Sequence, residues 1–212
     1  MRRAELPQPH RRSEAGDTPL PHPVREVPLS ALAGPYTSLP DPGNSDQIDC
    51  EAELAVVVGR PAHRAEPDQA ALAIAGYTVV NDISMRDWQH RTSQALQGKT
   101  FDRTTPPRPV LVSPDEVDHA HDLAIGCDVD GQSRQRGSTH DLLFTPADRV
   151  SYAGQFLTLL PGDLILTGTP SGTGEPTADH LRPGQTSHTW IDGIGECRNT
   201  ITHDDNSTAT TR

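Results

Sequence analysis

Short apolar runs that end at glycine, proline or aspartate are the feature that most constrains the fold of this chain. One of them, LAVVV at residues 54–58, is β-branched and closed by Gly59, which predicts a strand covered on both faces rather than a helical turn. The predicted strands are residues 54–58, 74–80, 111–113, 123–129, 156–160, 164–167 and 187–191. This spacing favours a β-dominated α+β domain.

Helix candidates are few. They are residues 67–73, 84–96 and 146–153. Before the last of them, Thr145 is placed to cap the helix and Asp148 falls in its first turn. Asp130-Gly131, between two segments expected to be extended, is typical of a type I′ hairpin turn.

Polar composition marks both ends of the 212-residue chain. Residues 1–28 and 203–212 are rich in Pro, Arg, His, Asp, Ser and Thr and lack apolar periodicity, so we expect a flexible N-terminal segment and a disordered tail. A single domain is then expected over residues 29–202. No apolar run has the length of a membrane span, and the N-terminus lacks the apolar segment of a signal peptide, which predicts a cytoplasmic protein.

Charge and cysteine usage exclude several classes of function. The formal net charge is −11 and Lys99 is the only lysine, so nucleic acid is not an expected partner, because phosphate binding needs clustered Lys and Arg. Cys50, Cys127 and Cys197 are odd in number, far apart and without CxxC spacing, which argues against a disulfide framework or a zinc site. We expect three reduced, structural thiols.

Two carboxylates open the first apolar run, in the stretch CEAELAVVVG. Because side chains alternate along a strand, Glu51 and Glu53 lie on one face and bring two negative charges together beside an apolar core. A hard divalent cation with oxygen ligands is a common way to offset such repulsion. The alternative is a solvated strand end with two surface glutamates.

A third carboxylate stands at the end of the next strand, in the stretch GYTVVNDISMRDWQ. Asp82 follows the apolar run and is well placed to be a third oxygen ligand. Arg86 and Gln89, three apart, share one face of a helix and can grip a substrate carboxylate. The alternative is structural: Asp82 or Ser84 caps the helix, and Arg86 pairs with Asp87 or Glu53.

Two further stretches carry groups that can contact an anion. In QGKTFD, Lys99 can stabilise an enolate or a carboxylate beside an acidic site, although the stretch lacks the leading glycine of a phosphate-binding loop. In LILTGTPSGTG, a strand leads into a loop whose backbone N–H and hydroxyl groups can approach an anion closely. A solvated lysine and a flexible turn are the structural alternatives.

In order and spacing, five stretches resemble the C-terminal catalytic domain of the fumarylacetoacetate hydrolase family. They are EAELAVVVGR, AGYTVVNDISMRDWQ, QGKTFD, LLPGDLILTGTPSGTG and IDGIGECRNTI. The resemblance covers residues 29–202 approximately. It implies a mixed, barrel-like β-roll, usually in a homodimer, that binds one Mg²⁺ or Mn²⁺ per chain and a small 2-oxo or dicarbonyl acid.

The resemblance also implies roles for individual residues. The metal ligands would be Glu51, Glu53 and Asp82. The substrate-contacting residues would be Arg86, Gln89, Lys99 and Thr169, with Lys99 also catalytic. The implied reaction is hydrolysis of a C–C bond in an acylpyruvate or a related 1,3-dicarbonyl or 2-oxo acid, through an enolate held by the metal. Decarboxylation of an oxaloacetate-type acid and keto–enol isomerisation are alternatives, because they pass through related enolates.

The base that activates water is where this sequence departs from the family pattern. Relatives usually carry an H-x-x-E pair on a mobile lid before this domain, and the nearest equivalent here is His10 and Glu14, one residue further apart. Both spacings return to the same face of a helix, so this pair can still serve as the catalytic base. The alternative function is a catalytically impaired relative that keeps the metal pocket and binds a ligand without turnover.

Overall fold

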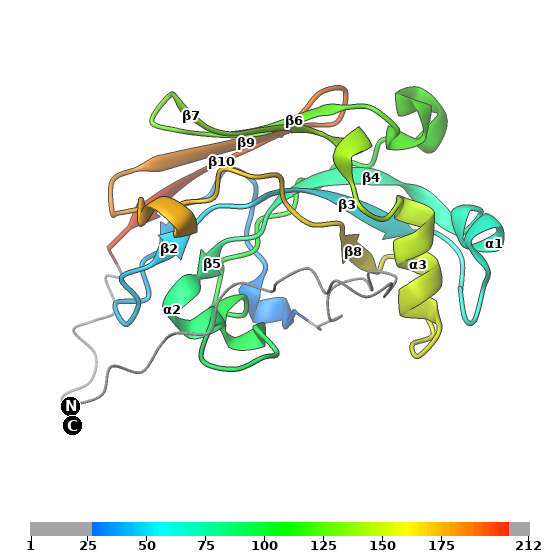
Figure 1. Ribbon diagram of the computed structural model, residues 1–212, viewed down its shortest axis with the longest axis horizontal. Helices are drawn as coiled ribbons and strands as arrows, with labels where there is room; N and C mark the ends of the chain where they lie inside the picture. Colours follow the sequence, from blue (N-terminus) through cyan, green and yellow to red (C-terminus); the bar gives the residue numbers. More distant parts are fainter. Residues whose placement is uncertain (1–26, 204–212) are drawn as a thin grey trace, which may run out of the picture.

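The computed structural model describes residues 27–203, which form two packed β-sheets, a two-stranded ribbon and three short α-helices (Figure 1). The five-stranded sheet lies along the top of this view, and the three-stranded sheet lies beneath it. Within the described residues, no helix has the length and apolar character needed to cross a membrane. The architecture is the β-dominated α+β fold predicted from the sequence.

The larger sheet has the strand order β1-β10-β9-β6-β7, with every neighbouring pair antiparallel except β1 and β10. Its strands are β1 (Leu39–Pro40), β6 (Ala124–Val129), β7 (Gln132–Ser138), β9 (Thr186–Ile191) and β10 (Gly195–Thr202). Asp130 and Gly131 have φ angles of 51° and 78°. The predicted type I′ turn between β6 and β7 is therefore confirmed, since that turn needs positive φ at both central residues.

The smaller sheet, with the order β4-β3-β8, carries the candidate site. Its antiparallel strands are β3 (Ala52–Val58), β4 (Ile74–Asn81) and β8 (Leu164–Leu166). Six of the seven residues of β3 are buried, as predicted for a strand covered on both faces. A separate ribbon pairs β2 (Ile48–Asp49) with β5 (Ser84–Met85). This ribbon joins the chain just before β3 to the chain just after β4.

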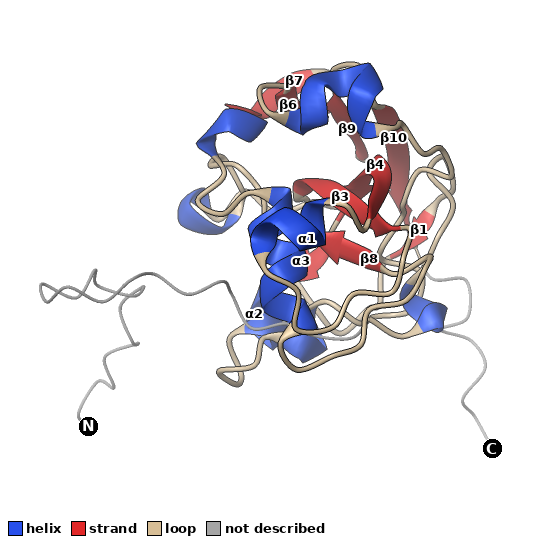
Figure 2. Cartoon of the chain, turned by 90° about the vertical axis from the view of Figure 1, so that its right-hand side faces the viewer, coloured by secondary structure: helices blue, strands red, loops and turns tan. Residues whose placement is uncertain are grey.

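Helices α1 (Pro67–Ala71) and α3 (Pro146–Gly154) lie at one end of the molecule, the end that faces the viewer in Figure 2. The third α-helix is α2 (Arg86–Gln89), and the 3₁₀ turns are η1 (Leu29–Ala31), η2 (Leu96–Gly98), η3 (Pro114–Ala120), η4 (Thr139–Asp141) and η5 (Glu175–Thr177). Helices α1 and α3 pack on each other in front of β3 and β8. Thr145 and Asp148 form a capping box at the start of α3, which confirms the predicted cap.

The hydrophobic core lies between the two sheets, where β3 and β4 contact β6, β9 and β10. Leu54 and Val79 of the smaller sheet and Ile191 of the larger one are at most 2% exposed. The three cysteines are free and buried in the structure, in agreement with the expectation of reduced, structural thiols. Burial of this apolar surface is the main stabilising contribution to the fold.

Three expected elements are wrong. Residues 84–96 form β5 and the one-turn helix α2 instead of a longer helix, because the first two residues pair with β2 and Ala95 has a φ of 57°. Residues 156–160 are not a strand, since hydrogen bonds to the end of α3 continue through Leu157. Residues 111–113 contribute a single bridge, because the prolines on either side lack the N–H that a ladder requires.

Candidate functional site

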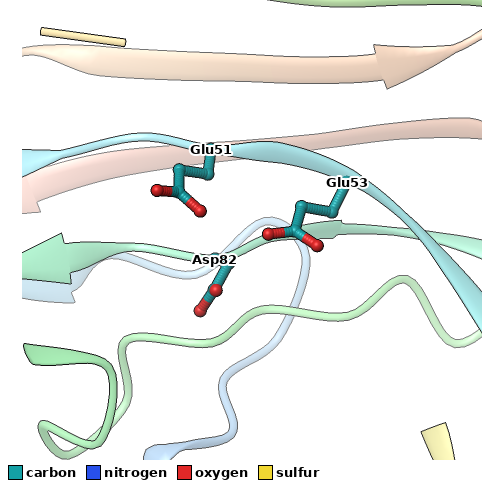
Figure 3. A group of neighbouring side chains, drawn as sticks. All are labelled: Glu51, Glu53 and Asp82. Atoms are coloured by element: carbon teal, nitrogen blue, oxygen red, sulfur yellow. The ribbon is translucent and has the colours of Figure 1, made fainter. Parts of the chain in front are cut away.

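Three carboxylates converge where β3 begins and β4 ends (Figure 3). Glu51 directly precedes β3, Glu53 lies within it, and Asp82 directly follows β4. The antiparallel pairing of β3 with β4 sets this meeting, and the backbone N–H of Asp82 donates to the carbonyl of Glu51 at 2.9 Å. All three side chains are buried, and one oxygen of each lies within 4.8 Å of the other two. The alternative of two solvated surface glutamates is therefore wrong.

The only lysine of the chain lies in the same cluster. Lys99 Nζ is 2.6 Å from Glu51 Oε2 and 2.7 Å from Asp82 Oδ2, and the residue is 2% exposed. It directly follows η2, which packs tightly on α2, because a Cβ added to Gly98 would lie 2.6 Å from the Cα of Gln89. Glycine at position 98 allows η2 to lie close to α2, and this places the Lys99 ammonium group in the cluster. The alternative of a solvated Lys99 is therefore wrong.

A buried guanidinium borders the Glu51 side of the cluster. Arg86 donates from Nε to Asp49 at 2.9 Å, from Nη1 to Gln89 Oε1 at 2.8 Å, and contacts Glu51 Oε1 through Nη1 at 2.6 Å. It is 2% exposed, and its ion pairs are with Asp49, Glu51 and, at 3.7 Å, Glu175. Among the described residues it forms no ion pair with Asp87 or Glu53, the two partners of the structural alternative. Arg86 and Gln89 share one face as predicted, and they contact each other.

The two glutamates differ in their electrostatic environment. Burial alone would raise the pKa of Glu51, but the charges of Lys99 and Arg86 outweigh it and lower this pKa to about 2. Burial and the negative charges of Asp82 and Glu51 raise the pKa of Glu53 well above its ordinary value. The Glu51 side of the cluster is therefore balanced by cations, whereas the Glu53 side carries excess negative charge.

The loop after β8 is hydrogen-bonded to two carboxylates, Glu53 in β3 and Asp49 in the segment that precedes it. The backbone N–H of Gly168 donates to Glu53 Oε2 at 2.6 Å, and that of Gly174 donates to Asp49 Oδ1 at 2.8 Å. The sequence predicted that backbone groups of this loop approach an anion closely. In the structure the anions are carboxylates of the protein itself.

Thr169 lies in this loop, and its hydroxyl is engaged by the protein. Its Oγ1 donates to the carbonyl of Ala52 at 3.0 Å and accepts from Nε2 of the buried Gln135 at 2.8 Å. These bonds fix the loop against the first residue of β3. Contact between Thr169 and a substrate stays a prediction.

The residues present suit a hard divalent cation. Glu51, Glu53 and Asp82 offer only oxygen ligands, which Mg²⁺ and Mn²⁺ prefer, and they are close enough together to share one ion. The raised pKa of Glu53 shows that the described residues leave its negative charge incompletely offset, which a divalent cation would correct. The donor set and its charge thus fit the metal implied by the sequence.

Asp49 is a site residue that the sequence reasoning missed. It is fully buried, holds Arg86 through Oδ2, and accepts backbone N–H groups of Cys50 and Gly174 through Oδ1. The signal for it was present, because Asp49, Glu51 and Glu53 alternate along the chain. The predicted base, His10 with Glu14, lies outside the described residues.

Comparison with known proteins gives the family. Residues 7–202 match the model for the C-terminal domain of fumarylacetoacetate hydrolase. The chain belongs to the fumarylacetoacetate hydrolase family. A human mitochondrial oxaloacetate tautomerase is 44% identical over 147 residues, which make up 68% of this chain and 47% of the relative. The chain therefore spans about half the length of that relative.

Solved structures of the family share the fold. A 2-hydroxyhepta-2,4-diene-1,7-dioate isomerase from Mycobacterium marinum has a TM-score of 0.78 at 35% identity, over 84% of this chain and 68% of that one. A fumarylpyruvate hydrolase from Pseudomonas aeruginosa, in complex with Mn²⁺ and pyruvate, has a TM-score of 0.75 at 32% identity, over 84% of this chain and 77% of that one. These family members are enzymes of three kinds: a tautomerase, an isomerase and a hydrolase.

Proposed function

We propose that this protein is a divalent-metal-dependent enzyme that acts on a small 2-oxo acid through an enolate, by keto–enol tautomerisation of an oxaloacetate-like acid. The observation that carries the proposal is the buried meeting of Glu51, Glu53 and Asp82 beside the ammonium of Lys99. The 44% identity to an oxaloacetate tautomerase supports this choice of reaction.

Each group of the site has a task in this reaction. Glu51, Glu53 and Asp82 would hold Mg²⁺ or Mn²⁺, which when bound supplies a Lewis acid for the 2-oxo group. The Lys99 ammonium donates hydrogen bonds in a buried site, where a cation stabilises developing enolate charge more strongly than in water. The oxygen of Gln89 is taken by Arg86, which leaves its amide N–H groups to face a substrate oxygen.

Tautomerisation is favoured over hydrolysis because it needs fewer groups. It moves one proton between carbon and oxygen, whereas hydrolysis also requires a base that activates water. That base was assigned from the sequence to His10 and Glu14, outside the described residues. Hydrolysis of an acylpyruvate is the second candidate, and the similarity to a fumarylpyruvate hydrolase that binds Mn²⁺ and pyruvate supports it.

The test is to follow loss of the enol absorbance of oxaloacetate with purified protein, after chelator treatment and after reloading with Mg²⁺ or Mn²⁺. Release of pyruvate from acylpyruvates and from oxaloacetate is measured in parallel. Glu53→Gln removes one ligand charge, and Glu66→Gln makes the same change at an exposed position before α1.

Metal-dependent enol decay that is lost in Glu53→Gln and kept in Glu66→Gln supports the tautomerase. Metal-dependent pyruvate release from acylpyruvates, without enol decay, replaces it with the hydrolase, and release from oxaloacetate alone indicates a decarboxylase. Metal binding without any turnover overturns the proposal in favour of a catalytically impaired relative.

We also propose that the protein forms a homodimer. Leu143, Phe156 and Leu160 are each more than half exposed, and a subunit interface would remove this apolar area from water. Light scattering coupled to size-exclusion chromatography measures the mass directly, and a mass of one chain would contradict this proposal.

A further inference from the structure

Two arginines border the carboxylate cluster, and they differ in the number of anionic and polar groups that they contact. Arg86, beside Glu51, contacts two buried carboxylates and the oxygen of Gln89. Arg149, on α3, forms no ion pair with a carboxylate of residues 27–203, and its buried Nε has no hydrogen-bond partner among them. The second arginine therefore has donors that a bound anion can use.

The guanidinium of Arg149 is partly removed from water. Its Cζ lies 5.5 Å from the ring centroid of Phe144, and burial lowers the pKa of Arg149 from its usual value, an effect that the charge of Glu53 partly offsets. An arginine stays charged in proteins even so. A half-buried cation without an anionic partner costs free energy, which a bound anion would recover.

Arg149 also lies next to the candidate site. A Cβ added to Gly168 would be 3.7 Å from Nη2 of Arg149, and the N–H of the same Gly168 donates to Glu53 Oε2 at 2.6 Å. One backbone residue thus separates this guanidinium from the Glu53 carboxylate. Arg149 borders the Glu53 end of the cluster, and Arg86 borders the Glu51 end.

We propose that Arg149 binds a second carboxylate of the substrate, so that the enzyme selects dicarboxylic 2-oxo acids over monocarboxylic ones. This inference rests on the proposed function, because it assumes that the 2-oxo acid group is held at the Glu51, Glu53 and Asp82 cluster. The planar guanidinium suits two-point binding of a carboxylate, and the positive charge is available from the start. Arg149 is then a specificity residue that touches substrate away from the reacting carbons.

The structural alternative is that Arg149 serves only as a distant counter-charge for Glu53. Replacing it would then change the affinity for the metal, and for every ligand bound through the metal, by the same factor. Carboxylate recognition predicts a different result, because only ligands with the second carboxylate would be affected.

Malate and 2-hydroxybutanoate separate these possibilities, because both can chelate a metal and they differ only in a terminal carboxylate or methyl group. Their affinities are measured by isothermal titration calorimetry on the Mn²⁺-loaded protein, for wild type, Arg149→Met and Arg149→Lys. Arg60→Met, at an exposed position after β3, is the matched control. Titration of Mn²⁺ alone and thermal melting of each variant accompany the measurement.

Wild type is expected to prefer malate, and Arg149→Met to lose about ten- to a hundredfold in malate affinity with 2-hydroxybutanoate and Mn²⁺ binding unchanged. Arg149→Lys is expected to keep part of the preference, because it keeps the charge. An unchanged malate preference in Arg149→Met, or an equal loss for both ligands, overturns the inference while the metal site stands. Failure of wild type to bind either ligand with Mn²⁺ present refutes the proposed function, and the inference with it.

Discussion

Replacement of Glu53 by Gln is predicted to change stability in opposite directions with and without metal. The pKa of Glu53 in the folded protein is raised above its ordinary value of 4.5, by burial and then by the charges of Asp82 and Glu51. The folded state therefore holds this proton more tightly than the unfolded chain, and stability falls as the pH rises above 4.5. Glutamine is neutral and its amide oxygen can still accept from Gly168, so the metal-free variant should be more stable than wild type near pH 7.

The metal reverses this order. At a metal concentration one hundred times Kd, binding to the wild-type fold adds about 2.7 kcal/mol to the free energy of unfolding. For a domain of this size that corresponds to a rise in Tm of roughly 5–11 °C. If loss of the Glu53 charge weakens metal binding a hundredfold, the same metal concentration adds only about 0.4 kcal/mol.

The assay is calorimetric melting near pH 7 in the presence of a chelator, then of Mg²⁺, then of Mn²⁺. Glu66→Gln is the control, since it makes the same chemical change at an exposed site. A Glu53→Gln protein that melts below wild type in chelator, and that gains as much from metal as wild type does, would refute the electrostatic account of this cluster.

Three further predictions follow from individual contacts. The pKa of Glu51 is lowered to about 2, so its ionised form stabilises the metal-free fold above pH 4.5 and this contribution, about 3 kcal/mol, is lost as the pH falls from 4.5 to 2. Urea unfolding across this range should show a steeper pH slope in wild type than in Glu51→Gln, and equal slopes would contradict this assignment. Gly172→Ala should lower the free energy of unfolding more than Gly131→Ala does. Both glycines have positive φ, which costs any L-residue about 1–2 kcal/mol, but only at Gly172 would the added Cβ meet a backbone oxygen, that of Arg134, at 2.1 Å. Equal losses in urea unfolding would contradict the clash. The three buried thiols should react with a thiol reagent only after unfolding, when three thiols per chain are counted. Burial protects them, and it is the main cause that raises the pKa of Cys197 to about 12.

Strands β3 and β4 were predicted correctly because each contains a contiguous run of apolar residues. Strand β10 was missed because its buried positions are not all apolar. Asn199 is fully buried in it, and its amide donates to the carbonyls of Gly34 and Thr37. A hydropathy pattern does not show burial that is achieved by hydrogen bonding. The two-residue strands β1 and β2 depend on partners far away in the chain, which no local pattern contains.

The carboxylates at the start of β3 could be predicted from the sequence because they lie two residues apart along the chain. Alternation along one strand places Glu51 and Glu53 on one face, and the same rule would have included Asp49. The position of Arg149 could not be predicted from the sequence, because α3 approaches Gly168, which binds Glu53, only through packing of the folded chain. Gly98 was noted as part of a motif, but its steric reason, the close approach of η2 to α2, exists only in three dimensions.

Lys99 makes the electrostatic environments of Glu51 and Glu53 different, although both carboxylates belong to one site of like charges. Both are buried on the same face, yet Lys99 bonds Glu51 and Asp82, and the pKa values of the two glutamates shift in opposite directions. The Lys99 ammonium holds two of the prospective ligands in place before any metal arrives, which lowers the cost of organising them. The charge that remains to be offset is concentrated at Glu53. A divalent cation therefore gains most of its electrostatic stabilisation from Glu53. Replacing Glu53, rather than Glu51, should for this reason weaken metal binding without destabilising the metal-free fold.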